Sequence, residues 1–189
     1  AAASIAHEVT FLTTELEQWI AGVLADGWSR GVRRVQAEGE RGLQGFLVER
    51  LSGLGATNAL IGSALDALRN GGHDLGQPWT WGDEEMRTLA KALRQGLFPL
   101  HVAVNKLDVA PEGVMDHLSL DVPATACLAD MELALRRADA AGLIRYRTGD
   151  TDFHVSEDAP LSEAQRAALE RMRGALSTSG GTGIEALLD

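Results

Sequence analysis

The sequence predicts an α/β fold in which a predominantly helical first half leads into a small sheet. Two observations carry this prediction. Through most of the first half, apolar side chains recur at the three- and four-residue spacing of amphipathic helices. From Leu97 to Val104 the chain becomes a short, mostly apolar run closed by a polar turn, which is typical of a buried strand. The 189 residues, 45% of them hydrophobic, suffice for a core without disulfides.

The first half contains four helical patterns, which begin near residues 9, 40, 57 and 83. Turns rich in glycine separate them. Thr57 is expected to cap the third helix and Asp83 the fourth, because short polar side chains satisfy the free N–H groups of a first helical turn. The first half is therefore predicted to be nearly all helix.

The second half is predicted to alternate short extended runs with helices. The elements expected after residue 104 are a strand ending at Val122-Pro123, a helix over Met131–Ala141 closed by Gly142, an extended stretch over Leu143–Phe153, and a helix opened by the capping-box residues Ser162 and Gln165. A glycine-rich break over Gly180–Gly183 precedes a last short helix. This alternation is typical of an α/β protein.

Composition narrows the classes of partner. Seventeen basic against twenty-seven acidic side chains leave a net charge of −10, which disfavours nucleic acid and anionic membranes. No apolar run approaches the roughly 18 residues of a membrane span. Cys127 is the single cysteine, so no internal disulfide forms, and the cytoplasm is the expected location. The five histidines show no metal-ligand spacing, and no metal site is expected.

The motif Asn105-Lys106-Leu107-Asp108 follows the predicted strand directly. Ligand-binding residues of an open α/β sheet lie at this end of a strand. Guanine offers two adjacent donors, N1–H and the exocyclic amine, and a carboxylate matches both, so Asp108 is predicted to select guanine. Asn105 either reaches the N7/O6 edge of the base or ties the loop to its neighbours. Lys106 is expected to lay its aliphatic stem over the base.

A second loop is predicted to contact guanine O6 through a backbone N–H. Ala126 is the candidate for this contact, with Thr125 supporting the turn that follows Val122-Pro123. The alternative is a strand-to-helix turn without a ligand.

The chain has no motif for binding phosphates. A Walker A loop needs Gly-Lys followed by Ser or Thr, but Lys91 follows Ala90 and Lys106 follows Asn105, and these are the only two lysines. The sequence Asp139-Ala140-Ala141-Gly142 spells D-x-x-G, but it is interpreted as the end of a helix.

The order of several motifs resembles the middle of an Obg-superfamily GTPase, of the archaeal and fungal branch of the YchF-like proteins. The motifs that carry the resemblance are Phe11-Leu12 with Glu15–Ile20, Glu49–Gly55, Asn105–Asp108, Glu132–Ala138, Gly142–Ile144, Gly149-Asp150 with Asp152-Phe153, and Thr182–Ile184. YchF proteins proper often end the base motif in Glu and prefer ATP, so Asp108 argues for GTP.

The resemblance implies a partial P-loop GTPase (Rossmann-like) sheet with a predominantly helical inserted segment. Residues 1–26 would be a helix of the GTPase domain, 27–95 the helical insert, and 96–189 the C-terminal part of the GTPase domain with the guanine-reading motifs. The P-loop would precede Ala1 and a TGS domain would follow Asp189, so the chain is expected to be a fragment.

The same resemblance implies the ligands and partners. The expected ligand is GTP or GDP, with Mg²⁺ held in the full-length parent by residues outside this chain. The parent is expected to hydrolyse GTP and to associate with the ribosome, whereas the chain alone is expected to be inactive. No membrane and no sequence-specific nucleic acid are expected as partners.

The alternative function is a helical protein- or ribosome-interaction module without nucleotide binding. Trp79 and Trp81 either form a partner-binding patch or anchor their loop to the core. Four arginines either contact RNA or share a solvated face with acidic residues; they are Arg30, Arg33, Arg34 and Arg41.

Overall fold

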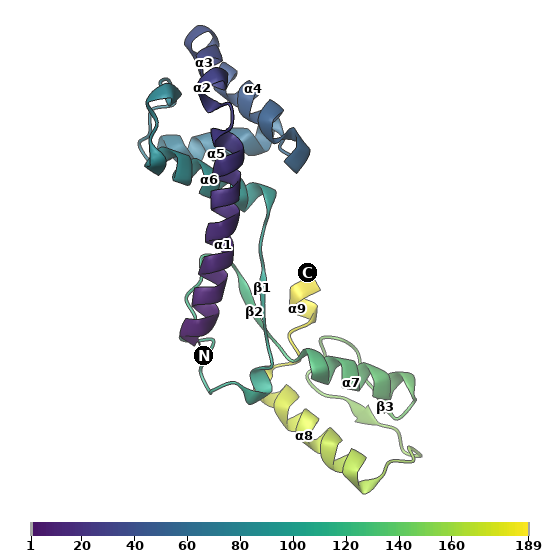
Figure 1. Ribbon diagram of the computed structural model, residues 1–189. Helices are drawn as coiled ribbons and strands as arrows, with labels where there is room; N and C mark the ends of the chain where they lie inside the picture. Colours follow the sequence, from purple (N-terminus) through teal and green to yellow (C-terminus); the bar gives the residue numbers. More distant parts are fainter. Residues whose placement is uncertain (1, 189) are drawn as a thin grey trace. The chain divides into compact units, whose positions relative to one another are not determined.

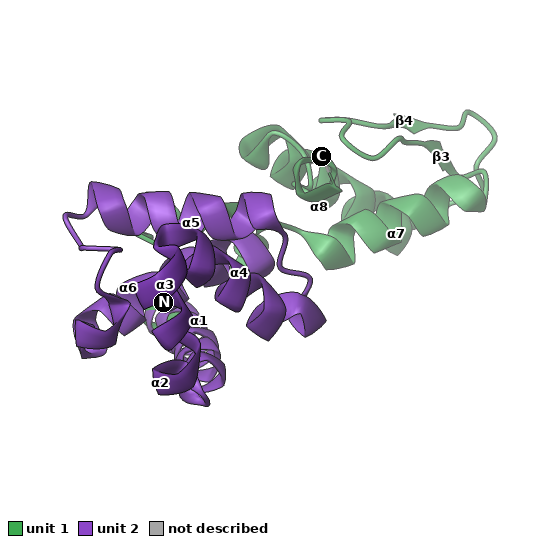
Figure 2. Ribbon diagram, turned by 90° about the horizontal axis from the view of Figure 1, so that it is seen from above, with its two compact units in different colours: residues 1–6, 101–189 green, residues 7–100 purple. Residues whose placement is uncertain are grey.

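The computed structural model describes residues 2–188 and divides the chain into two compact units (Figure 2). Unit 2 comprises residues 7–100, and unit 1 comprises residues 1–6 with 101–189. The predicted domain boundaries at 26/27 and 95/96 stay predictions. Among the described residues, no helix has both the length and the apolar character that crossing a membrane requires.

Unit 2 is helical throughout (Figure 1). Its elements are α1 (Ala2–Ala25) from His7 onward, α2 (Trp28–Gly31), α3 (Arg33–Glu38), α4 (Glu40–Leu51), η1 (Ser52–Leu54), α5 (Asn58–Asn70), η2 (Pro78–Thr80) and α6 (Asp83–Leu97). Leucine and isoleucine from the long helices fill one core, among them Ile20, Leu47, Ile61 and Leu93. Burial of these apolar faces, rather than helix propensity, stabilises the unit.

Of the two helix caps predicted in unit 2, one is confirmed and one is wrong. Thr57 Oγ1 accepts the Leu60 N–H at 3.2 Å at the start of α5. At α6 the N-cap is Gly82 rather than Asp83, because the Glu85 carboxylate reaches back and accepts the Gly82 N–H at 2.9 Å. Asp83 instead occupies the first turn, where its charge faces the positive end of the helix dipole.

The predicted strand over Leu97–Val104 is shorter than expected. Helix α6 continues to Leu97, and β1 covers only Val102–Asn105. Leu97 and Phe98 pack against the helical core instead. The apolar run that predicted one strand therefore belongs partly to the helical core and partly to β1.

Trp81 and Arg34 of unit 2 follow the structural alternatives, an anchored loop and a solvated face. The Trp81 ring stacks on Trp28 with centroids 5.6 Å apart, and its indole N–H donates to the Asp74 carbonyl at 2.8 Å. The Trp81 side chain thus anchors its loop, whereas 42% of Trp79 is exposed. Arg34 forms an exposed ion pair with Glu49 at 2.8 Å, as expected for a solvated face.

The described part of unit 1 contains two short sheets and three helices, besides the first residues of α1. β1 pairs in parallel with β2 (Ala124–Cys127), and β3 (Ile144–Arg145) pairs antiparallel with β4 (His154–Val155). The helices are α7 (Ala129–Ala140), α8 (Glu163–Ser179) and α9 (Glu185–Leu188), with a 3₁₀ turn, η3, over Leu107–Val109. The predicted α/β class is confirmed: the described chain is mostly helical with a small parallel sheet.

Helix ends in unit 1 match local sequence signals. Ser162 and Gln165 form the predicted capping box, with hydrogen bonds of 2.8 and 3.3 Å. Gly142 adopts a left-handed φ of 70° just beyond α7, so the D-x-x-G sequence ends a helix as interpreted.

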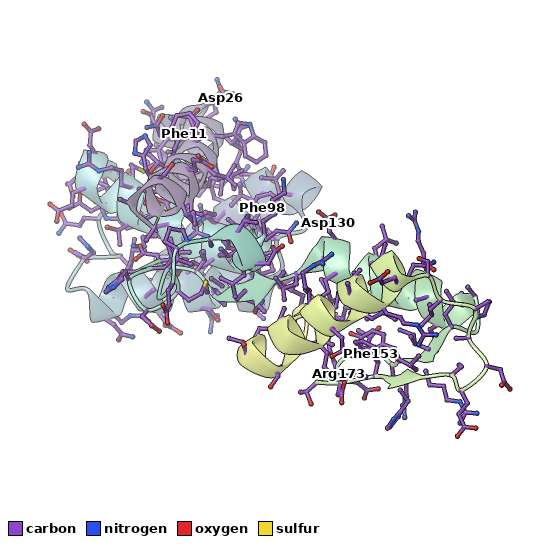
Figure 3. All side chains as sticks on the ribbon, turned by 90° about the horizontal axis from the view of Figure 1, so that it is seen from below. Phe11, Asp26, Phe98, Asp130, Phe153 and Arg173 are labelled. Carbon is purple, nitrogen blue, oxygen red and sulfur yellow. The ribbon has the colours of Figure 1, made fainter. Side chains whose placement is uncertain are left out.

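A second core lies between α7, β3, β4 and α8 and includes Leu135, Ile144, Phe153 and Leu176. The guanidinium of Arg173, on α8, lies 4.6 Å from the centre of the Phe153 ring (Figure 3). This contact fastens the β4 strand region to α8.

Candidate functional site

The backbone is strained where the predicted base motif begins. Asn105 is the last residue of β1, and Lys106 follows with φ 64° and ψ 41°. Among the described residues, Lys106 is the one non-glycine residue with a left-handed φ. Such a conformation costs a side-chain-bearing residue about 1–2 kcal/mol and concentrates at functional sites. The turn therefore has a conformation that its sequence does not favour by itself.

The strained turn presents Asp108 to solvent. Residues Leu107–Val109 form a 3₁₀ turn in which the Val109 N–H donates to the Lys106 carbonyl at 3.2 Å. The Asp108 carboxylate is exposed and has no hydrogen-bond or ion-pair partner among the described residues. Both of its oxygens are thus available as acceptors.

Asn105 ties its loop to the start of α7. Its Oδ1 accepts the backbone N–H of Ala129 at 3.1 Å. This is the second of the two roles predicted for Asn105. The contact joins the carboxyl end of β1 to the start of α7, which follows β2; the two strands lie side by side in Figure 1.

The first turn of α7 has two unused donors. The Leu128 N–H donates to the Thr182 carbonyl at 2.9 Å, and the Ala129 N–H is taken by Asn105. The N–H groups of Asp130 (labelled in Figure 3) and Met131 have no acceptor among the described residues. A helix N-terminus leaves such groups without intrahelical partners, and they carry partial positive charge.

One small pocket brings the two loops together. Its lining residues are Asn105, Lys106, Asp108, Leu128, Ala129, Asp130 and Met131. The pocket therefore combines a free carboxylate, a lysine side chain and two unpaired backbone donors. This arrangement suits a planar ligand that offers adjacent donors on one side and an acceptor on another.

A larger cleft of about 760 Å³ shares Asp108 and Leu128 with this pocket. The loop that follows the base motif and the C-terminal half of α8 line it. Glu112 and Asp116 add two carboxylates to Asp108, and no basic residue lines the cleft. Phosphate groups are unfavourable there because of charge repulsion.

Thr125 and Ala126 do not lie in a loop, so the predicted turn is wrong. Both belong to β2, where Thr125 pairs with Ala103 and Ala126 with Val104. Thr125 Oγ1 lies 2.8 Å from His101 Nε2. The strand begins after Pro123 instead of ending there, because the run from Ala124 to Cys127 continues the parallel ladder. The sequence signal that could have placed this strand correctly is the continuous, mostly apolar character of residues 124–128.

A buried carboxylate, that of Glu132, lies behind this site and was not predicted from the sequence. Glu132, one turn into α7, is 5% exposed and accepts three hydroxyl hydrogen bonds. The donors are Tyr146 at 2.7 Å, Thr148 at 2.6 Å and Thr182 at 2.6 Å. Burial raises the pKa of Glu132, but these hydrogen bonds outweigh it and hold the pKa below its usual value. Burial and the bond to Glu132 raise the pKa of Tyr146 to about 12.

Among residues 2–188, no group of three or more His, Cys, Asp or Glu side chains is placed to hold a metal ion.

Comparisons with known proteins point to one family. Residues 103–189 match the Obg-like GTPase YGR210-like, G4 motif-containing domain. The chain is 30% identical over 186 residues to the GTP-binding protein MJ1332 of Methanocaldococcus jannaschii, covering 95% of this chain and 44% of that protein.

The fold also matches a solved structure. The crystal structure of a GTP-binding protein from Pyrococcus horikoshii OT3 superposes with a TM-score of 0.70 at 23% identity, over 96% of this chain and 48% of that one. The chain thus spans less than half the length of either relative.

Proposed function

Since residues 103–189 match an Obg-like GTPase domain that contains the G4 motif, we propose that this chain supplies the guanine-recognition site of a GTP-binding protein. The observation that carries the proposal is the free Asp108 carboxylate, presented by a strained turn beside two unpaired backbone donors. Its two oxygens match guanine N1–H and the exocyclic amine. Adenine lacks this donor pair and leaves the carboxylate unpaired.

The remaining contacts follow from the same pocket. The donor for guanine O6 is an N–H of Asp130 or Met131, in place of Ala126, which lies inside β2. The pocket holds about 20 Å³, room for one water molecule, so the base lies across its mouth. Lys106 is exposed at this mouth and covers one face of the base with its aliphatic stem.

Phosphate and magnesium binding require residues beyond these. The 189 residues contain no Gly-Lys-Ser or Gly-Lys-Thr sequence, and the neighbouring cleft is acidic. GTP or GDP therefore binds through its base here and through its phosphates and Mg²⁺ in another part of a longer parent protein. The same proposal includes hydrolysis of GTP, the YchF-like branch and association with the ribosome, which rest on the sequence resemblance. It also includes a cytoplasmic location, which rests on the single cysteine.

A second candidate function, protein or ribosome interaction, concerns unit 2. Helix α1 exposes the large apolar side chains Phe11, Leu12 and Trp19, with exposed fractions of 62%, 51% and 48%. Exposed apolar side chains grouped on one element are typical of contact surfaces. Replacing Phe11 and Leu12 with serine is expected to abolish co-sedimentation with ribosomes, and unchanged co-sedimentation would remove this candidate.

The test of guanine recognition uses nucleosides, because they isolate the base contact from the phosphates. Guanosine titrated into the ¹⁵N-labelled chain is expected to shift the amide signals of Lys106, Asp108, Asp130 and Met131, whereas adenosine leaves them in place. Asp108→Asn exchanges an acceptor for a donor, so preference is expected to pass from guanosine to xanthosine, whose C2 carries a carbonyl.

The matched control is Asp158→Asn, which removes the same charge at an exposed site that has no hydrogen-bond or ion-pair partner among the described residues. It is expected to retain the preference for guanosine. Equal shifts with guanosine and adenosine, or an unchanged preference in Asp108→Asn, would remove the proposal.

A further inference from the structure

We infer that Glu132 and Thr182 are positioning residues for guanine specificity, which hold the O6 donors of α7 in place without touching the nucleotide. The inference rests on the proposed guanine site. A buried hydrogen-bond network lies behind that site and leads to the unpaired N–H groups of Asp130 and Met131.

The Glu132 carboxylate is an unusual buried group. Three hydroxyls donate to it, and no arginine or lysine of the described chain lies within ion-pair distance. The positive charge of Arg136 acts on it from beyond ion-pair distance, and a buried charge without a directly paired counter-charge is a poor source of stability, but a fully satisfied polar network fixes one geometry. The carboxylate is therefore better suited to positioning its partners than to stabilising the fold.

Thr182 connects this carboxylate to the base loop. Its hydroxyl donates to Glu132 Oε2 at 2.6 Å, and its carbonyl accepts the Leu128 N–H at 2.9 Å. The side chain is 1% exposed. One residue thus bonds both the first turn of α7 and the residue that precedes the helix.

The backbone around Thr182 has little room to shift. Gly183 has a φ of 75°, and a Cβ placed there would lie 1.9 Å from the Ala126 carbonyl oxygen. The segment is consequently pressed against the end of β2, and only glycine fits. Together the glycine and the threonine fix where β2 ends and α7 begins.

The path from Thr182 to the base is short. Leu128, held by Thr182, immediately precedes Ala129, whose N–H is held by Asn105. The next two residues carry the unpaired N–H groups. Two anchors at Leu128 and Ala129 set the direction of those groups, and a shift at either anchor rotates them away from O6.

The network also supplies a matched control. Tyr146 donates to the same carboxylate oxygen at 2.7 Å, but no hydrogen bond joins Tyr146 to residues 128–131 in the described chain. Tyr146→Phe and Thr182→Val each remove one hydroxyl from Glu132. Only Thr182→Val removes the tie between Glu132 and the segment that holds Leu128.

Two nucleoside comparisons separate the contacts. The ratio of guanosine to 6-thioguanosine affinity reports the O6 contact, because sulfur is a weaker acceptor. The ratio of guanosine to xanthosine affinity reports the Asp108 contact. Both are measured by NMR titration of the 189-residue chain, with thermal unfolding recorded for every variant.

Thr182→Val is expected to lower the guanosine to 6-thioguanosine ratio by roughly 2- to 10-fold, the range that one net hydrogen bond supplies. The xanthosine ratio stays unchanged. Tyr146→Phe leaves both ratios unchanged at a similar loss of thermal stability, and Thr182→Ser restores the wild-type ratio. If Thr182→Val does not fold, Glu132→Gln is used in its place, and the same fall in the ratio of guanosine to 6-thioguanosine affinity is expected.

The inference is overturned if Thr182→Val and Tyr146→Phe change the 6-thioguanosine ratio equally, or if neither changes it while Asp108→Asn still switches preference to xanthosine. If Asp108→Asn has no effect on base preference, the proposed guanine site itself fails. The two failures are thus distinguishable in one series of measurements.

Discussion

The side-chain oxygen of Asn105 accepts the Ala129 N–H at 3.1 Å, which joins the carboxyl end of β1 to the first turn of α7. The contact links the two loops of the candidate site. Asn105 thus has a structural role, because it holds Asp108 and the α7 donors on one pocket.

Asn105→Ala is expected to loosen the start of α7. The variant removes the acceptor of the Ala129 N–H, so that amide should exchange with solvent faster, while the free energy of unfolding falls by only about 1 kcal/mol because the site is exposed. Asn105→Asp keeps the acceptor oxygen and serves as the control. Native-state amide exchange checks this, and equal protection of Ala129 in both variants would contradict it.

The left-handed backbone at Lys106 predicts an unusual ranking of substitutions. Glycine adopts φ 64° without strain, whereas a β-branched residue does so poorly. Lys106→Val should therefore have a free energy of unfolding lower by about 1–2 kcal/mol than Lys106→Gly. Urea unfolding at neutral pH measures the difference. Both variants lose the lysine stem, so both should bind guanosine more weakly than the wild type.

If the two Lys106 variants unfold at the same urea concentration, the left-handed turn is not maintained in solution. Lys106→Asn tests the same point independently, because asparagine tolerates the left-handed region better than valine.

Local signals allowed parts of the fold to be predicted from sequence. The Thr57 cap and the Ser162–Gln165 capping box depend on residues three apart, and both are observed. The boundary near Leu97 was missed because apolar residues serve a helical core as readily as a strand. Periodicity alone does not separate these cases in a short run.

The candidate site likewise contains residues that the sequence predicts and residues that it does not. The motif Asn105–Asp108 stands out as contiguous letters, and its place after β1 was predictable from the apolar run before it. The role of Glu132 was not predictable from the sequence, because its three hydrogen-bond partners lie 14, 16 and 50 residues away along the chain. The turn at Ala126 was misplaced because nothing local marks where β2 ends; the parallel register with β1 decides it. The guanine contacts of Thr125 and Ala126 find no support in this placement.

Breaking the ion pair between the buried guanidinium of Arg94 and the part-buried carboxylate of Glu17 is expected to destabilise unit 2. Arg94 is 1% exposed, and its Nε lies 3.0 Å from Glu17 Oε1. Glu17→Ala leaves the guanidinium buried without a partner and is expected to lower the free energy of unfolding by about 3 kcal/mol. Adding Arg94→Met, which preserves much of the side-chain volume, should recover most of this loss in urea unfolding. A double variant no more stable than Glu17→Ala would contradict the assignment.

Tyr146 is the single tyrosine of the chain, so its ionisation is observable without interference. Burial and the hydrogen bond to Glu132 raise its pKa to about 12 in the folded protein, against about 10 in the unfolded chain. Because the folded pKa is the higher one, the resulting stability is complete below pH 10 and is lost as the pH rises toward 12.

Absorbance of the phenolate after rapid pH jumps should therefore show a midpoint near pH 12, and a midpoint near 10 in guanidinium chloride. Glu132→Gln removes the charged acceptor, so the midpoint should move toward 10 while the ring stays buried. Thr182→Val keeps the carboxylate and removes a hydroxyl interaction that lowers the pKa of Tyr146, so it should leave the midpoint high. A wild-type midpoint near 10 would mean that the Tyr146–Glu132 bond, and the network built on it, does not form in solution.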